Sequence, residues 1–150
     1  MAARTSQGST WRGSDSFASF NSVVAMWHHR LLSTPTTPGL HGRTQGTWYT
    51  LTWQACGRRS RAIACGLQEL GVGRGDRVAL ISGTRPEWIL VDMAILAAGA
   101  ATTTLYPAAS MNETRHILRD SGAKICVVEV LAQADRVRSL SAELPDLEHI

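Results

Sequence analysis

The stretch that decides the fold is RVALISGTRPEWILVDMAILAAGAATTTL, which covers residues 77–105. Residues 78–81 form an apolar run directly after Arg77, and residues 101–105 are rich in β-branched threonine. Residues 77–81 and 101–105 are therefore predicted strands. Between them, Pro86 suits the first position of a helix, where its missing N–H is tolerated. The segment 87–98 has one aspartate as its only interior polar residue, which predicts a helix buried on most sides. The stretch therefore predicts a strand–helix–strand unit.

The same alternation continues on both sides of this unit. The predicted order is helix 52–70, strand 77–81, helix 87–98, strand 101–105, helix 111–120, strand 124–130 and helix 131–140. Such alternation predicts parallel βαβ units with right-handed crossovers, and hence an α/β fold. Ligands of such sheets bind beyond the carboxyl ends of the strands. Those ends are Ser82-Gly83-Thr84-Arg85, Tyr106-Pro107 and Val130.

The remaining segments have weaker patterns. We expect a helix over 17–32, a loop over 33–46, a short strand over 47–51 and the beginning of another strand within 144–150. The helix over 17–32 has apolar residues at three- and four-residue spacing, namely Phe20, Val23, Val24, Trp27 and Leu31. In the helix 52–70, Thr52 can cap the N-terminus and Gly71 can end it in a left-handed conformation. Its apolar stripe is Trp53, Cys56, Ile63, Leu67 and Leu70, with Ser60 as a weak member.

Composition excludes several classes of protein. The chain has 150 residues, of which 44% are hydrophobic and 18% charged, as is typical of one soluble globular domain. No apolar run approaches the roughly 20 residues that a membrane span needs. Three cysteines without a C-x-x-C motif exclude a disulfide scaffold and a zinc ribbon. We expect residues 1–14 to form a flexible tail and residues 15–150 to form the domain.

Charge is unevenly distributed along the chain. Residues 1–75 carry a net charge of +6 and residues 76–150 a net charge of −3. The densest basic point is Arg58, Arg59 and Arg61, which we interpret as the solvated face of a helix. Nucleic-acid binding is not expected, because no interleaved aromatic residues or longer basic stripe accompany these arginines.

Two segments have the look of phosphate-binding loops. Residues 71–76, GVGRGD, are rich in glycine but close a helix and open a strand, whereas a phosphate loop follows a strand and opens a helix. We therefore expect a structural turn there. Residues 82–85 have the correct order, but one glycine and no lysine exclude a Walker loop. An anion site at that helix start remains open.

No catalytic or metal-binding set emerges from the cysteines and histidines. Cys56, Cys65 and Cys126 are predicted core residues, because no histidine is expected close enough to activate a thiol. His28 and His29 are neighbours on a helix and point apart, and the other histidines are scattered at positions 41, 116 and 149. We therefore predict no catalytic residue, no cofactor-binding residue and no metal ligand within this chain.

Four segments carry motifs of a known family. They are WYTLTW at 48–53, GLQELGVGRGDRVA at 66–79, RPEW at 85–88 with AILAAGA at 94–100, and YP at 106–107 with HILRDSGAK at 116–124. In order and spacing they resemble the adenylate-forming (AMP-dependent) superfamily, and within it the fatty-acid–CoA ligases (acyl-CoA synthetases). The departures touch helix caps and packing: Ala55 stands where the family favours glutamate, Thr103-Thr104 where it often has Val-Pro, and residues 112–115 lack its usual Glu-Gln.

The resemblance implies a partial N-terminal subdomain of the adenylate-forming fold. It implies that the full-length enzyme is a cytoplasmic ligase of fatty acid metabolism, which binds ATP, Mg²⁺ and coenzyme A and joins a long- or medium-chain fatty acid to the coenzyme A thiol through an acyl-adenylate. The phosphate loop, nucleotide motifs and catalytic lysine of the family lie downstream, and the only lysine here is Lys124. We therefore expect this fragment alone to bind no cofactor and to be inactive. Peripheral membrane contact stays open, and the alternative is a non-catalytic binding or interaction module that retains this part of the fold.

Overall fold

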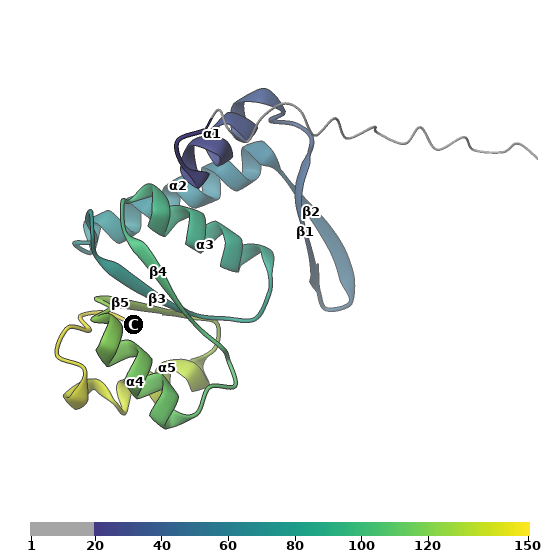
Figure 1. The fold of residues 1–150 in the computed structure, drawn as a ribbon. Helices are drawn as coiled ribbons and strands as arrows, with labels where there is room; N and C mark the ends of the chain where they lie inside the picture. Colours follow the sequence, from purple (N-terminus) through teal and green to yellow (C-terminus); the bar gives the residue numbers. More distant parts are fainter. Residues whose placement is uncertain (1–19) are drawn as a thin grey trace, which may run out of the picture.

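The computed structural model describes residues 20–150 and contains two sheets with five α-helices (Figure 1). The elements are α1 (Val23–Ser33), β1 (Pro38–Thr44), β2 (Thr47–Thr52), α2 (Trp53–Glu69), β3 (Arg77–Ile81), α3 (Pro86–Ala97), β4 (Ala101–Leu105), α4 (Met111–Ser121), β5 (Ile125–Val128) and α5 (Leu131–Arg138), followed by a 3₁₀ turn at Ser141–Glu143. Strands β3, β4 and β5 form a parallel sheet in the order β4–β3–β5. The α/β prediction with parallel βαβ units is confirmed.

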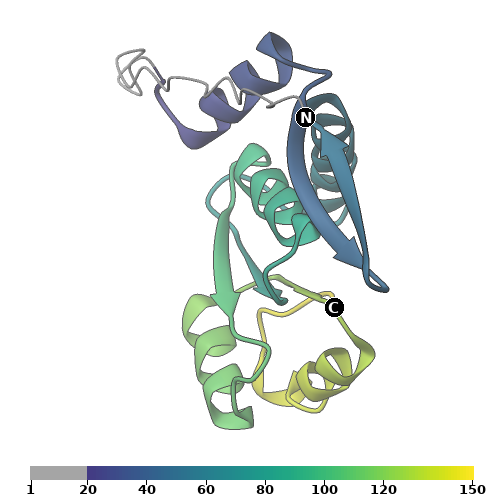
Figure 2. The ribbon, with the colours of Figure 1, turned by 90° about the vertical axis from the view of Figure 1, so that its right-hand side faces the viewer.

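The parallel sheet has helices on both faces. Helices α2 and α3 cover one face, and α4 and α5 cover the other (Figures 1 and 2). Val78 packs into the core under α2 and α3, whereas Ala79 and Ile81 pack into the core under α4 and α5. This division follows from the alternation of side chains along a strand. Because both faces are covered, the four residues after Arg77 are all buried, which explains the continuous apolar run.

The long helix α2 agrees with its predicted caps and differs in its buried stripe. The Thr52 hydroxyl accepts a hydrogen bond from the Ala55 N–H at 3.2 Å, and Gly71 has φ +85° as expected for a left-handed helix end. The buried side chains are Cys56, Ser60, Ala64 and Leu67. Leu70, which was predicted to belong to the stripe, is 44% exposed. The helix ends at Glu69, so the last predicted position lies beyond its packed face.

The predicted loop over 33–46 is wrong, because strand β1 lies within it and pairs antiparallel with β2. Its sequence, PGLHGRT, has neither alternation nor strong strand formers. The pairing depends on the turn at Gln45 and Gly46, both with positive φ, which favours a tight hairpin. It also depends on Gly42, because the Tyr49 ring of β2 occupies the space where a side chain at this position would lie. The hairpin packs beside α2 (Figure 2).

The first helix was predicted to begin too early. Helix α1 begins at Val23, and the Ser22 hydroxyl caps it by accepting a hydrogen bond from the Ala25 N–H at 3.1 Å. The expected start at Phe17 lies outside the described residues, as does the predicted tail over 1–14. Helix α4 has a capping box that the sequence reasoning missed: Ser110 and Glu113 each bond to the backbone N–H of the other.

The C-terminal residues lie along β5. His149 pairs with Ile125 in one parallel bridge, and the Cys126 N–H donates to the His149 carbonyl at 3.0 Å. The expected strand beginning within 144–150 is therefore present as a single bridge. The predicted strand over 124–130 is shorter in the structure, because β5 ends at Val128 and the chain turns into α5.

Candidate functional site at the carboxyl edge of the sheet

The predicted strand ends meet at the carboxyl edge of the parallel sheet and form two hollows. Residues 82–84 after β3 and residues 104–107 at the end of β4 line a cavity of about 260 Å³ together with Trp88. Ser82 and Arg85 also line a second cavity of about 240 Å³ with Glu129 at the end of β5. Val130 lines neither hollow. The three predicted strand ends thus lie at one edge of the sheet, as expected. At the end of β5, the residue that lines a hollow is Glu129, one position before the predicted end at Val130.

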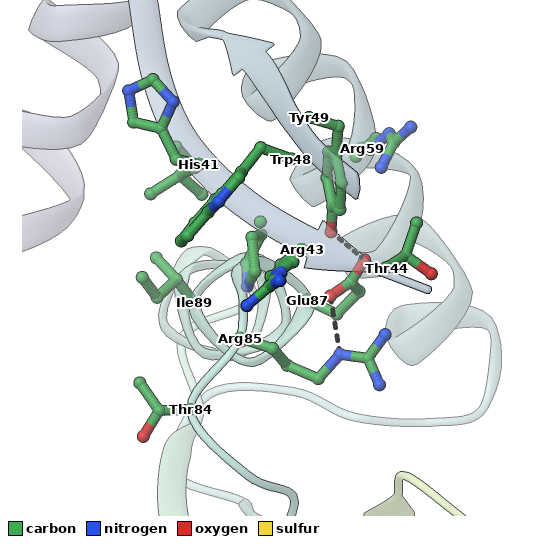
Figure 3. Close-up of a pocket in the computed structure, with 13 residues that line it drawn as sticks. His41, Arg43, Thr44, Trp48, Tyr49, Arg59, Thr84, Arg85, Glu87 and Ile89 are labelled. Atoms are coloured by element: carbon green, nitrogen blue, oxygen red, sulfur yellow. Dashed lines mark hydrogen bonds and ion pairs between the residues drawn. The ribbon is translucent and has the colours of Figure 1, made fainter. Parts of the chain in front are cut away.

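Arg85 joins two carboxylates at this edge. Its Nε lies 2.7 Å from Glu87 Oε2, and its Nη1 lies 2.8 Å from Glu129 Oε1. The Tyr49 hydroxyl, from the hairpin, donates to Glu87 Oε1 at 3.1 Å. Figure 3 shows Tyr49 and Arg85 reaching Glu87 from opposite sides. One polar network therefore holds the hairpin, the first turn of α3 and the end of β5 together.

The Glu129 carboxylate accepts hydrogen bonds from the turn after β3. Its Oε2 accepts a hydrogen bond from the Gly83 N–H at 2.8 Å and another from the Ser82 hydroxyl at 3.2 Å. An external anion in this turn would compete with Glu129 for these donors and for the Arg85 guanidinium. The anion site left open at the start of α3 stays a prediction, and the turn before this helix already holds a carboxylate of the chain itself.

The network fixes the charge states of its members. The Gly83 N–H first, and the Arg85 guanidinium next, lower the pKa of Glu129. Burial acts to raise the pKa of Glu87, but the hydrogen bond from Arg85 and the other donors outweigh it, so the pKa is lowered. Burial, and then the bond to Glu87, raise the pKa of Tyr49. These shifts move the three groups away from neutral pH, so none of them is poised as a general base.

A larger groove lies between the hairpin and the start of α3. It has a volume of about 580 Å³, and its lining includes Trp48 and Arg43 from the hairpin, Arg59 from α2 and Ile89 from α3 (Figure 3). The Arg43 guanidinium lies 5.8 Å from the centre of the Trp48 ring, within the range of a cation–π contact. Glu87 is the one acid in the lining, and Arg85 and Tyr49 already engage it.

The glycine-rich segment 71–76 lies at the opposite, amino edge of the sheet. There the Asp76 carboxylate accepts a hydrogen bond from the Gly73 N–H at 2.8 Å and pairs with Lys124 at 3.1 Å. The Gly73 N–H and Lys124 lower the pKa of Asp76. The side chain of Asp76 closes the turn that carries it, which supports the structural role expected for this segment.

The cysteine prediction is correct at two positions and wrong at one. Cys56 and Cys126 are buried, and burial raises the pKa of Cys126 to about 12. Cys65 is exposed. It lies nine residues after Cys56, and at 3.6 residues per turn this spacing puts the two thiols on opposite sides of α2. Within residues 20–150, no group of three or more metal-ligating side chains lies close enough together to hold an ion.

Sequence reasoning missed the three residues that bond around Arg85. Glu87 was placed at the start of a predicted helix, Tyr49 in a short strand and Glu129 inside a longer strand, and none of them was given a bonding role. One signal was available: Glu129 is the first charged residue after the apolar run of β5, at the sheet edge where ligands bind. No local pattern indicated that it would reach the turn after β3.

No helix among residues 20–150 is long and apolar enough to span a membrane.

Comparison with known proteins places the chain in a family. The AMP-binding enzyme family matches residues 28–150. The long-chain-fatty-acid–CoA ligase FadD15 of Mycobacterium tuberculosis is 40% identical over 105 residues, which cover 70% of this chain and 18% of that protein. An uncharacterized protein of Mycobacterium tuberculosis is 32% identical over 108 residues, covering 72% of this chain and 59% of that protein.

Solved structures share the fold. A putative long-chain-fatty-acid CoA ligase from Rhodopseudomonas palustris superposes with a TM-score of 0.75 at 22% identity, covering 90% of this chain and 34% of that one. The anthranilate CoA ligase AuaEII, in complex with anthranoyl-AMP, gives a TM-score of 0.74 at 24% identity, covering 85% of this chain and 24% of that one. This chain thus spans a small part of each ligase. It belongs to the AMP-binding enzyme family and corresponds to an N-terminal part of its adenylate-forming acyl-CoA ligases.

Proposed function

We propose that this chain contributes the N-terminal part of an AMP-forming fatty-acid–CoA ligase. In the proposed reaction, a fatty-acid carboxylate oxygen attacks the α-phosphorus of ATP, the bond to pyrophosphate breaks, and the coenzyme A thiolate then displaces AMP from the acyl carbon. The observation that carries the proposal is the 40% identity over 105 residues with a long-chain-fatty-acid–CoA ligase. The proposed enzyme acts in the cytoplasm with peripheral membrane contact, and it does not bind nucleic acid.

We assign no chemical step to the described residues themselves. Lys124, the only lysine, is paired with Asp76 at the amino edge of the sheet, whereas ligands of parallel sheets bind at the carboxyl edge. Mg²⁺ belongs to the proposed reaction of the whole enzyme, but residues 20–150 offer no group of side chains that fits it. In the proposed enzyme the Arg85 network therefore positions the sheet edge, and the chain alone is inactive.

ATP–pyrophosphate exchange tests the inactivity of this chain. With a long-chain fatty acid and Mg-ATP, the isolated polypeptide is expected to give no exchange above a protein-free blank. Exchange that is lost in Glu129→Gln, in a variant that circular dichroism shows to be folded, would show that this chain carries its own adenylation site, and would overturn the proposed inactivity.

A chimera tests the ligase assignment separately. The 105 residues of FadD15 that align with this chain are replaced by the corresponding residues of this chain, and acyl-CoA formation from a long-chain fatty acid is measured. The chimera is expected to keep its activity, because the replaced segment has the same role in both proteins. A chimera that folds, as judged by gel filtration and circular dichroism, but makes no acyl-CoA would contradict the proposed role.

A second candidate function is a non-catalytic binding or interaction module. It is favoured by the uncharacterized relative, of which this chain covers 59%, because a segment like this one makes up most of that protein. The module is expected to unfold as a monomer in one two-state transition, without binding a dye that reports exposed apolar surface. Dye binding and a broad transition would instead support the ligase fragment.

A further inference from the structure

A groove of about 560 Å³ lies between helices α1 and α2, away from the sheet edge described above. Its position is set by a close approach of the two helices, since a methyl group at Gly57 would meet Leu31 Cδ1 at 2.9 Å. The apolar part of the lining is Leu31, Leu32, Ala62 and Cys65. The groove is therefore an apolar depression formed by two packed helices.

The two charged side chains of this groove are both arginines. Its lining contains Arg58, Arg61 and His28, and no acidic residue. Both arginines are exposed, and within residues 20–150 neither forms an ion pair. The surrounding sequence does not offset them, because residues 16–68 contain no aspartate or glutamate. As far as residues 20–150 are concerned, two arginines are therefore available to an anionic partner.

An exposed leucine lies beside these arginines. Leu32 is 68% exposed, although it is a large apolar side chain, and it shares the groove lining with Arg58 and Arg61. Arginine binds phosphate oxygens through two parallel hydrogen bonds, and a leucine next to it can enter the acyl boundary of a bilayer. Nucleic acid fits less well, because the lining contains no tryptophan, tyrosine or phenylalanine on which bases could stack, and its one ring is the His28 imidazole.

We propose that the α1–α2 groove docks onto bilayers that contain anionic lipid, with Arg58 and Arg61 on lipid phosphates and Leu32 in the acyl boundary. The docking surface lies on the opposite side of the parallel sheet from α4 and α5. It requires no catalysis, so its failure and the failure of the ligase proposal are distinguishable. It gives the proposed peripheral membrane contact a specific surface.

Vesicle co-sedimentation of the full chain tests this surface. Vesicles of phosphatidylcholine alone are compared with vesicles of phosphatidylcholine and phosphatidylglycerol in equal parts. Binding is expected only to the anionic vesicles, and it should weaken as salt is added, because salt screens exposed charges. Equal binding to both vesicles, or to neither, would overturn the proposal.

Variants locate the contact. Each basic residue near an anionic surface contributes about fivefold to partitioning, so Arg58→Ser with Arg61→Ser is expected to weaken binding about 25-fold. The Leu32→Ser variant is expected to weaken binding without changing its salt dependence. The matched control is Arg119→Ser, an exposed arginine on α4, compared with Arg61→Ser alone; the control is expected to keep most of the affinity. Equal losses in these two variants would show that net charge alone acts, and would contradict the groove.

Two further measurements complete the test. Thermal unfolding by circular dichroism checks that each variant is folded. Duplex DNA is added as a competitor, and is expected to release little protein from the vesicles. Binding to DNA that is tighter than to vesicles, and that is lost in the double arginine variant, would assign the groove to nucleic acid and overturn the proposal.

Discussion

The Arg85 guanidinium meets the Glu129 carboxylate at 2.8 Å, although 44 positions of sequence separate the two residues. The same carboxylate accepts the Gly83 N–H, so one side chain at the end of β5 holds both the backbone and the arginine of the turn after β3. Two strands that are neighbours in the sheet are thereby also joined at their carboxyl ends. This contact has measurable consequences for stability.

Removal of the Glu129 carboxylate is expected to destabilise the fold. In Glu129→Ala, the Gly83 N–H and Arg85 lose their shared acceptor. We expect the free energy of unfolding to fall by about 1–2 kcal/mol, a figure that already allows for the partial exposure of the pair. Urea denaturation followed by circular dichroism measures it. The control is Asp135→Ala, which removes an exposed pair with Arg138 and should change stability by less than about 0.5 kcal/mol. Equal effects of the two substitutions would contradict the role given to Glu129.

Acid is expected to weaken the fold through Glu87 and Glu129. Their folded-state pKa values lie below the ordinary value of 4.5, so the unfolded chain binds more protons in acid. Their stabilisation is fully present above about pH 4.5 and is lost as the pH falls through the folded-state pKa values. Urea titrations over this range should give a smaller pH dependence for Glu129→Gln than for the wild type. An unchanged pH dependence would show that Glu129 is not the linked group.

The hairpin is expected to be sensitive to one added methyl group. In Gly42→Ala the new Cβ collides with the Tyr49 ring, which must move and release Glu87, with an expected loss of about 1–3 kcal/mol. Gly66→Ala is the matched control: nothing lies near its new methyl group and it sits inside α2, so stability should rise by up to about 1 kcal/mol. Thermal unfolding of both variants gives the comparison, and a loss of stability in both would contradict it.

Thiol reactivity should separate the three cysteines. Cys65 is exposed and is expected to react quickly with a chromogenic disulfide reagent, whereas Cys56 and Cys126 are buried. Burial also raises the pKa of Cys126 to about 12, so its thiolate is scarce at neutral pH. One thiol should therefore titrate in the native chain and three in denaturant, and Cys65→Ser should abolish the native reaction. A second rapid thiol in the native protein would be inconsistent with this packing.

Local sequence patterns predicted the parallel sheet better than the hairpin. Strands β3 and β4 begin and end where the apolar and threonine-rich runs predicted. Strand β3 is buried on both faces, so its continuous apolar run identifies it without its neighbours. Strand β4 is largely half-buried or exposed, and its β-branched threonines identify it instead. Strand β1 has two glycines and a proline in seven residues, and it exists through its pairing with β2. Its stabilising contacts are made with the partner strand, so the local sequence pattern of β1 does not predict them.

The sequence predicted where the candidate site lies in the sheet, but it did not predict which side chains bond to one another there. The rule for ligand sites in parallel sheets indicated the edge where Ser82 and Tyr106 lie. It could not indicate which acid would fill the turn, because Glu129 lies 46 positions from Gly83 and several acids are available in between. Long-range pairing of this kind depends on the assembled sheet, which brings the ends of β3 and β5 together.

Strand β3 contributes side chains to two hydrophobic cores, one on each face of the sheet. Val78 faces the helices on one side and Ala79 the helices on the other, so a slip of one residue in this short strand would exchange the two sets of side chains. Neither layer can rearrange without disturbing the other. The two helical layers are therefore expected to lose protection from hydrogen exchange together, as a single cooperative unit with β3 at its centre.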